Sequence, residues 1–209
     1  LLDEAQDCFA YNYEKKVKQK SQESKAFKIT GKYHAHDWTS VIQAIIELDT
    51  LKGAAHKYNA TVTEYISAVI LFNVSQTYYY NHKNKQSNLK LPIRLFVPIN
   101  VRKYFNSTTL RNFVLFLRTT SSFKKDVSFE EVLEHVKDTF IKENNEEAML
   151  ARIKTNMKLE KNVFVRFMPL FIKSIIIKIV FHFIGTGSNT ISFSNLGKVN
   201  LPKDMIQHI

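Results

Sequence analysis

A long period-two stretch between residues 89 and 101 constrains the fold of this chain more than any other feature. Its apolar positions are Leu89, Leu91, Ile93, Leu95, Val97, Ile99 and Val101, and the opposite side carries Lys90, Arg94, Asn100 and Arg102. Such alternation is typical of a β-strand with one buried face. Because Pro92 and Pro98 lack the N–H group that a β-ladder uses, we expect the paired part to be Ile93–Val97, near an edge or a strand end.

Other stretches indicate further strands. Residues 112–120 form a nearly continuous apolar run, which predicts an interior strand. Residues 26–30 and 190–196 alternate, which predicts a short strand at each place. The apolar segment 41–48 fits either a strand or a helix, because its length does not decide between them.

Helix start and stop signals divide much of the remaining chain. Asp49 or Thr50 is expected to cap a helix that Asn59 ends in a left-handed conformation. Thr61 and Glu64 form a capping box, in which each side chain satisfies a free amide of the other residue. This box predicts a well-buried helix that runs to about residue 80.

A second capping box, Ser128 with Glu131, predicts a helix whose apolar residues share one stripe. That stripe contains Phe129, Val132, Leu133, Val136 and Phe140. A further helix is expected to end near Lys161. Strands and helices are mixed over residues 1–209 without a clear linker or an internal repeat, so a single α/β domain is the simplest interpretation.

Residues 163–184 form the most apolar stretch of the chain. It contains Arg166, Lys173 and Lys178, and a charge at the centre of a bilayer costs about 2.5–3.5 kcal/mol, so we expect no transmembrane segment. Our interpretation is a buried helix that begins at Pro169. The alternative is a helix that lies on a membrane surface.

The formal net charge is +11, from 30 Lys and Arg against 19 Asp and Glu. Lysine dominates, and the chain shows no module in which arginines and aromatic residues alternate, so we expect no nucleic-acid partner. The basic residues gather in two groups and fit a solvated surface that attracts a phosphate-bearing small molecule. These groups are Lys15, Lys16, Lys18, Lys20, Lys25, Lys28 and Lys32, and His82, Lys83, Lys85 and Lys90.

Metal and thiol chemistry have little support in the sequence. Cys8 is the single cysteine, which excludes a disulfide framework and a cysteine-ligated zinc site and fits a cytoplasmic location. The pattern His34-Ala35-His36-Asp37 lacks a third defined ligand, so we expect no metal site there. No glycine-rich phosphate loop and no pair of catalytic carboxylates are visible.

Three segments carry a resemblance to a known family. Val97-Pro98-Ile99-Asn100-Val101-Arg102 with the later Arg111-Asn112-Phe113 resembles the "VPVNLR…RNF" segment of alcohol acetyltransferases and condensation-type enzymes. Ile191-Ser192-Phe193-Ser194-Asn195-Leu196-Gly197 with Leu201-Pro202 is similar to their late "SNLG…LP" strand, and Thr61–Ile66 to their "TVTEYL" helix start. In order and spacing the chain resembles the C-terminal half of the chloramphenicol-acetyltransferase-like superfamily.

This resemblance implies a two-layer sandwich, with a mixed and mostly antiparallel sheet and helices packed on one face. It also implies an acyltransferase in which acyl-CoA is a co-substrate rather than a tightly bound cofactor, and the acceptor is a hydroxyl or an amine. The two halves of such enzymes enclose a tunnel. By motif position Arg102 would meet the other half, Asn100 and Asn112 would lie near the tunnel, and Ser192 or Asn195 would donate to the oxyanion.

The chain departs from the family in one respect, because it contains no HHxxxD motif. In the family the histidine of that motif is the general base. Since the chain begins with Leu1, we expect the catalytic N-terminal half to be a separate part of the same protein and the 209 residues alone to be inactive. The alternative is a non-catalytic interaction module that retains the fold, and self-association through a bare interdomain face is a further expectation.

Overall fold

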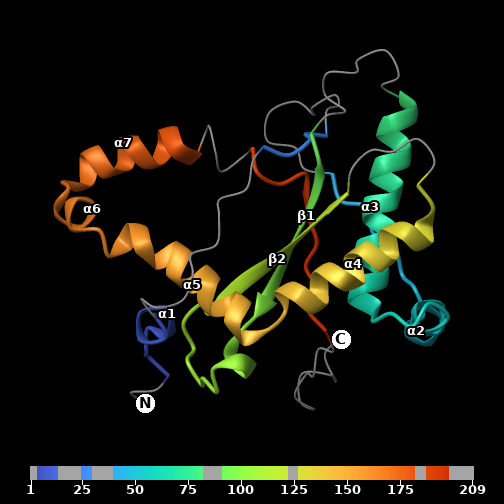
Figure 1. Cartoon of the computed structure of the whole chain (residues 1–209), viewed down its shortest axis with the longest axis horizontal. Helices are drawn as coiled ribbons and strands as arrows, with labels where there is room; N and C mark the ends of the chain where they lie inside the picture. Colours follow the sequence, from blue (N-terminus) through green and yellow to red (C-terminus); the bar gives the residue numbers. More distant parts are fainter. Residues whose placement is uncertain are drawn as a thin grey trace.

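A small mixed sheet lies at the centre of the computed structural model, which describes residues 4–13, 25–29, 40–81, 91–121, 127–181 and 187–197 (Figure 1). Its strands are β1 (Ile93–Asn100), β2 (Val114–Ser121) and β3 (Ile191–Ser192), in the order β2-β1-β3. β1 is antiparallel to β2 and parallel to β3. Seven α-helices accompany the sheet in the described ranges, so the prediction of an α/β fold is confirmed.

β1 is longer and more central than its sequence predicted. It pairs with β2 along its whole length and with β3 on its other side, so the expected edge position was wrong. The carbonyls of Arg94 and Phe96 accept hydrogen bonds from the amides of Thr190 and Phe193, at 2.8 and 2.9 Å. Even-numbered residues of β1 therefore direct their backbone groups toward β3. Pro98 is tolerated because the described pairing with β3 ends before it.

β2 is an edge strand among the described residues, contrary to the prediction of an interior one. Leu115, Leu117 and Thr119 are buried on one face, whereas Val114 is exposed. The run looked continuous because Phe116 is apolar on the opposite face. There its ring packs against the ring of Phe96, with 4.8 Å between centroids. Apolar residues on both faces thus reflect this aromatic pair rather than a second neighbouring strand.

Helices α3 (Val62–Asn81) and α4 (Phe129–Glu143) pack against each other and against β1 and β2 (Figure 1). Their contact with the odd-numbered residues of both strands forms the core. Fully buried core residues include Ala68, Leu71, Ile93, Leu95, Leu117, Val136, Met149 and Ile153. β1, β2 and α4 follow one another along the chain, and β2 contacts both β1 and α4.

The capping predictions for α2 (Leu48–His56) and α3 were partly confirmed. Asn59 has φ +51°, the left-handed conformation expected of a helix stop. The amide of Thr61 donates to Glu64 Oε2 at 2.8 Å, and the amide of Glu64 donates to Thr61 Oγ1 at 3.2 Å, which confirms the capping box. The expected cap of α2 was wrong, because Glu47 occupies the N-cap position.

The predicted N-cap and apolar stripe of α4 and the predicted end of α5 (Glu146–Glu160) were confirmed. The amide of Glu131 donates to Ser128 Oγ at 3.1 Å, so Ser128 is the N-cap of α4. The stripe predicted for α4 faces the core, where Val132, Leu133, Val136 and Phe140 are buried and Phe129 is partly buried. Helix α5 follows after Asn144 and Asn145 and ends one residue before Lys161.

The predicted strand 26–30 is not a strand in its described part, and the segment 41–48, expected to be either a strand or a helix, is mostly irregular. Residues 25–29 form no strand, although the amides of Ala26 and Phe27 donate to Gly187 O and Pro92 O at 2.8 and 2.9 Å. Residues 40–47 are neither strand nor helix, and the apolar side chains of Val41, Ile42, Ile45 and Ile46 are exposed. β3 covers only the beginning of the predicted strand 190–196.

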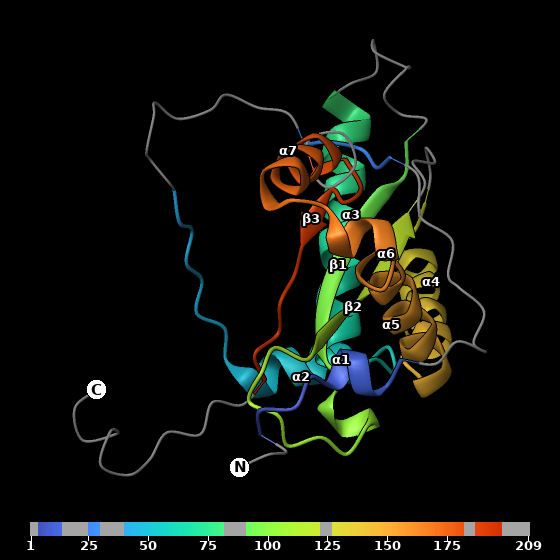
Figure 2. The same ribbon diagram turned by 90° about the vertical axis from the view of Figure 1, so that its left-hand side faces the viewer.

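The predicted helix that begins at Pro169 is present, but the prediction that it is buried was wrong. Helices α6 (Val163–Phe167) and α7 (Leu170–Val180) form an arm that extends away from the sheet (Figure 1) and points toward the viewer in Figure 2. Pro169 is the N-cap residue of α7, as expected, but Phe171 is 68% exposed and Ile175 57%. Apolarity predicted burial, whereas the described part of the chain covers these residues only in part. No helix in the described ranges is both long enough and apolar enough to cross a bilayer.

Helix α1 (Cys8–Tyr11) completes the described elements, with a short 3-10 turn, η2, at Arg102–Tyr104. Several sequence features lie outside the described residues: His34–Asp37, Lys15 to Lys20, the basic group 82–90 and Leu201-Pro202.

Candidate functional site

The three segments that carry the family resemblance meet at one pocket, at the lower end of the sheet in Figure 1. The first turn of α3, the end of β1 and residues 195–197 after β3 form its wall. The pocket has a volume of about 400 Å³. Its described lining residues are Thr61, Thr63, Glu64, Val97, Pro98, Ile99, Asn100, Lys103, Leu117, Phe140, Asn144, Asn195, Leu196 and Gly197.

The start of α3 supplies the polar side of the pocket. Glu64 Oε2 accepts hydrogen bonds from both the amide and the hydroxyl of Thr61, each at 2.8 Å. A carboxylate thus already occupies the positive end of the helix dipole. The helix start therefore contributes hydroxyls and one anionic group to the pocket, rather than an open anion site.

Asn195 connects the segment after β3 to α3. Its Nδ2 donates to Thr63 Oγ1 at 2.9 Å, and its Oδ1 accepts from the amide of Gly197 at 2.8 Å. Gly197 has φ +68°, where a side chain would be strained, so glycine suits this turn. Residues 132 positions apart in sequence are thereby held side by side at the pocket.

Asn100 lines the pocket, whereas Arg102 is not among its described lining residues, and the expectation that Arg102 meets the other half of the protein stays a prediction. The guanidinium of Arg102 turns back on the β1–β2 connection, where Nε donates to Thr109 O at 2.8 Å and Nη2 to Arg111 O at 2.7 Å. Asn100 Oδ1 accepts from Arg102 Nη1 at 3.1 Å. Arg102 therefore stabilises the β1–β2 connection by hydrogen bonds to its backbone carbonyls.

Ser192 and Asn112 also lie outside the described lining of the pocket. Ser192 pairs in register with Phe96, and its side chain is exposed. Asn112 is exposed in the connection just before β2. Of the five residues expected near a tunnel, the fold brings Asn100 and Asn195 to one pocket and leaves the other three outside it.

Sequence reasoning missed Lys103 and Asn144 as pocket residues. Asn144 caps the C-terminus of α4, and its Oδ1 accepts from the hydroxyl of Tyr104 at 2.6 Å. Lys103 Nζ lies 4.8 Å from the centre of the Tyr104 ring. Lys103 follows the "VPINVR" segment directly, so its sequence position was a usable signal. Asn144 gave none, because its place depends on how α4 crosses the sheet.

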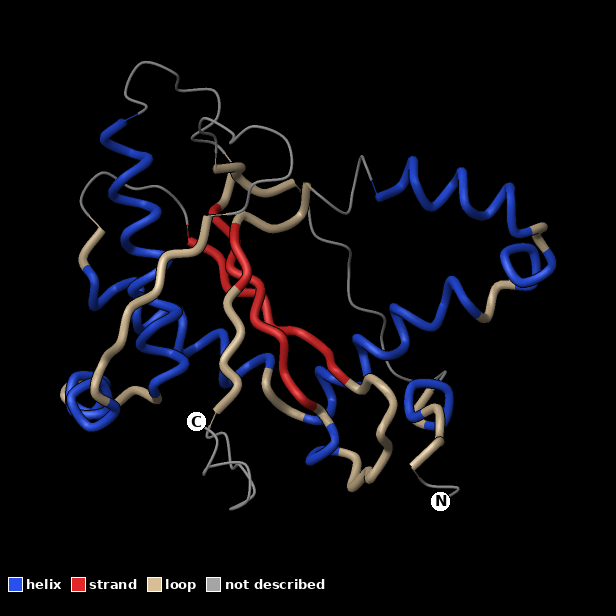
Figure 3. Tube along the Cα trace, turned by 180° about the vertical axis from the view of Figure 1, so that it is seen from behind, coloured by secondary structure: helices blue, strands red, loops and turns tan. Residues whose placement is uncertain are grey.

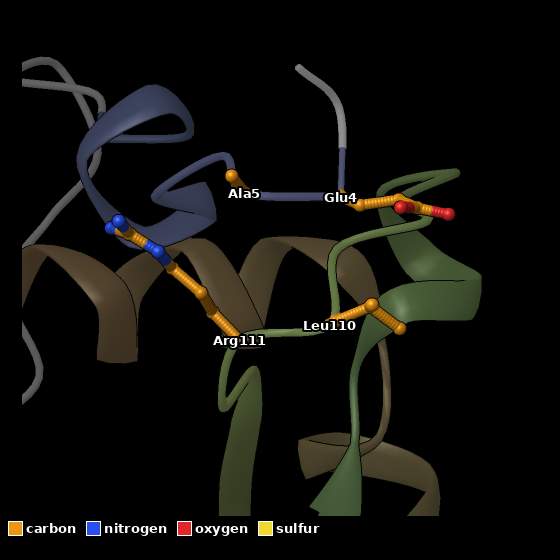
Figure 4. Close-up of a pocket in the computed structure, with 4 residues that line it drawn as sticks. All are labelled: Glu4, Ala5, Leu110 and Arg111. Carbon is orange, nitrogen blue, oxygen red and sulfur yellow. The ribbon is translucent and has the colours of Figure 1, made fainter. Parts of the chain in front are cut away.

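A second pocket, of about 430 Å³, forms where the N-terminal segment crosses the β1–β2 connection (Figure 4). Glu4, Ala5, Leu110 and Arg111 line it, and the side chains of Glu4 and Arg111 point away from each other. The amide of Leu110 donates to Glu4 O at 2.8 Å. This pocket belongs to the joint between two chain segments and gathers no reactive groups.

The chemistry available at the first pocket is hydrogen bonding and charge. Hydroxyls, side-chain amides, one ammonium and one carboxylate converge there, with apolar groups from β1, β2 and α4. No histidine is among its described lining residues. Within the described ranges, no group of three His, Cys, Asp or Glu side chains is placed to hold a metal ion.

Comparison with known proteins adds no assignment, because no family model and no curated protein matches this chain.

Proposed function

We propose that this chain is the C-terminal half of an acyltransferase of the chloramphenicol-acetyltransferase-like type, acting on acyl-CoA and a hydroxyl or amine acceptor. One observation carries the proposal. Three motif segments that are far apart in sequence, around Thr63, Asn100 and Asn195, line a single pocket. A chance resemblance of three short motifs gives no reason for them to meet in space.

The pocket residues suit the binding of an acyl thioester. Asn195 Nδ2 has two N–H donors, and the bond to Thr63 uses one of them, so the second is available to a carbonyl oxygen. A preorganised donor of this kind stabilises a developing oxyanion. The ammonium of Lys103 supplies a cation for the phosphates of coenzyme A, in a chain whose net charge of +11 favours anionic ligands.

The general base must come from another polypeptide segment, since the sequence has no HHxxxD motif. This chain then contributes the donor-binding wall, and a histidine beyond it takes the proton from the acceptor. The proposal therefore requires a partner half that carries the motif and faces the pocket.

Calorimetric titration of the chain with acetyl-CoA tests the proposal. We expect saturable binding that Asn195→Ala and Lys103→Gln weaken, each by about fivefold to tenfold for one lost polar contact. Asn112→Ala is the matched control, because Asn112 is an exposed asparagine outside the pocket. Absence of binding, or equal binding by all variants, would overturn the proposal. Acyl transfer by the chain alone would refute the claim that the general base comes from another polypeptide segment.

A non-catalytic interaction module is the second candidate. The exposed apolar side chains of residues 41–46 favour it, because such groups are typical of a segment that a partner covers. This candidate predicts no affinity for acetyl-CoA. It also predicts that the remainder of the protein lacks HHxxxD, so sequencing the full coding region separates the two candidates.

A further inference from the structure

The arm formed by α6 and α7 presents large apolar side chains to solvent along most of its length. Figure 3 shows it on the right-hand side, apart from the strands. Its exposed residues are Val163, Phe164, Phe167, Leu170, Phe171, Ile172, Ile175, Ile176, Ile177, Ile179 and Phe181. Contiguous apolar surface of this kind marks an interaction site.

Most apolar residues of α7 share one face, whereas Leu170 and Ile177 lie on the opposite face between the two lysines. At 100° per residue, Phe171, Ile172, Ile175, Ile176 and Ile179 fall within one continuous arc. Lys173 and Lys178 lie at the two borders of that arc. Lysines at such borders extend their ammonium groups outward while their methylene stems continue the apolar face.

The charges of the arm have a single sign. Residues 163–181 contain Arg166, Lys173 and Lys178 and no aspartate or glutamate. A symmetric contact between two copies would place this purely cationic surface against itself, which is unfavourable. An anionic lipid surface instead offers phosphates at the depth of the lysines and acyl chains for the isoleucines.

We propose that the α6–α7 arm is a membrane-surface anchor, which lies in the headgroup region of a bilayer containing anionic phospholipid. Helix α7 lies parallel to the surface, with Phe171, Ile175 and Ile179 toward the acyl chains. The arm does not cross the bilayer, because α7 covers only 11 residues. The anchor is independent of acyl-CoA binding, since none of its residues lines the pocket.

Co-sedimentation of the full chain with vesicles tests the anchor. The vesicles contain phosphatidylcholine with phosphatidylserine, or phosphatidylcholine alone. We expect binding to the first kind to be much stronger. Lys173→Gln and Lys178→Gln should each weaken it by about fivefold. The double variant I175S/I179S should weaken it by about tenfold or more, because it removes apolar area that the lipid buries.

Two control variants separate the contribution of the arm to vesicle binding from that of charged and apolar residues elsewhere in the chain. Lys57→Gln removes one exposed lysine outside the arm, and Ile141→Ser removes one exposed isoleucine of α4. Both should bind as the unchanged chain does. Circular dichroism of every variant confirms that the fold is retained.

Three results would overturn the anchor. The first is a folded chain that fails to sediment with phosphatidylserine vesicles. The second is binding that the arm variants and the control variants weaken equally, which would assign it to the overall charge of +11. The third is self-association of a chain that does not bind vesicles, measured by analytical ultracentrifugation and abolished by I175S/I179S.

Discussion

Replacing Arg102 by methionine should destabilise the chain while leaving its core intact. The guanidinium donates to Thr109 O at 2.8 Å, to Arg111 O at 2.7 Å and to Asn100 Oδ1 at 3.1 Å. Hydrogen bonds of charged groups contribute about 1.5–3 kcal/mol each when buried. Here the bond to Thr109 O is partly buried, whereas the other two are exposed and are weakened by water.

Arg102→Met is therefore expected to lower the free energy of unfolding by about 2–3 kcal/mol, and most of this loss comes from the bond to Thr109 O. For a chain of this length, each kcal/mol lowers the melting temperature by about 2–4 °C, which gives a fall of about 4–12 °C. Urea unfolding followed by circular dichroism measures the change as a lower midpoint with an unchanged slope.

Arg111→Met is the matched control, because Arg111 lies on the same connection and its side chain is exposed. Its free energy of unfolding should change by less than about 0.5 kcal/mol. Equal midpoints for Arg102→Met and Arg111→Met would refute the stabilising role of Arg102. Arg102→Lys should behave like the methionine variant, since lysine cannot donate in three directions from one planar group.

Two further predictions test the core and a helix stop. Leu71→Ala should lower the free energy of unfolding by about 2–5 kcal/mol, because the side chain of Leu71 on α3 is fully buried in the core. Ile42→Ala should leave it unchanged, because the side chain of Ile42 is 96% exposed. Thermal unfolding of both variants checks this, and equal melting temperatures would contradict the core assignment. Asn59→Ala should destabilise by about 1 kcal/mol and Asn59→Gly should not, because φ is +51° at this position; a tolerated alanine would argue against the left-handed stop.

Local signals in the sequence predicted local structure well. The pairs Thr61–Glu64 and Ser128–Glu131 act within one helical turn, so they do not depend on the rest of the fold. The left-handed residue Asn59 is local in the same sense. The alternation of β1 also identified its buried face, since Ile93, Leu95 and Val97 are all covered.

Predictions that depend on neighbours were less accurate. The predicted positions of the two long strands in the sheet were reversed. Pro98 indicated that β1 lies at an edge, and the apolar residue Phe116 indicated that β2 lies in the interior, whereas β1 is the central strand and β2 is at the edge of the described sheet. The observed pairing explains both residues: Pro98 lies beyond the described pairing with β3, and Phe116 packs against Phe96. The arm was predicted to be buried because apolarity measures a tendency to leave water, not what is available to cover the side chains.

The candidate site was predicted in part. Asn100 and Asn195 were identified by motif position, and the fold brings both to the pocket. The motif assigned Arg102 to a contact with the other half, and it did not predict the hydrogen bonds of Arg102 within this chain, because a motif gives no information on side-chain direction. The carbonyls of Thr109 and Arg111 that accept these bonds belong to a connection with no regular structure, which sequence patterns do not position.

The pocket as an acyl-CoA site is the central claim, and nuclear magnetic resonance tests it most directly. The chain, labelled with nitrogen-15, is titrated with acetyl-CoA while the side-chain amide signals of its asparagines are followed. The account predicts saturable shifts for Asn100, Asn144 and Asn195, which line the pocket, and none for Asn112. Unchanged spectra, or shifts confined to residues outside the pocket, would contradict it.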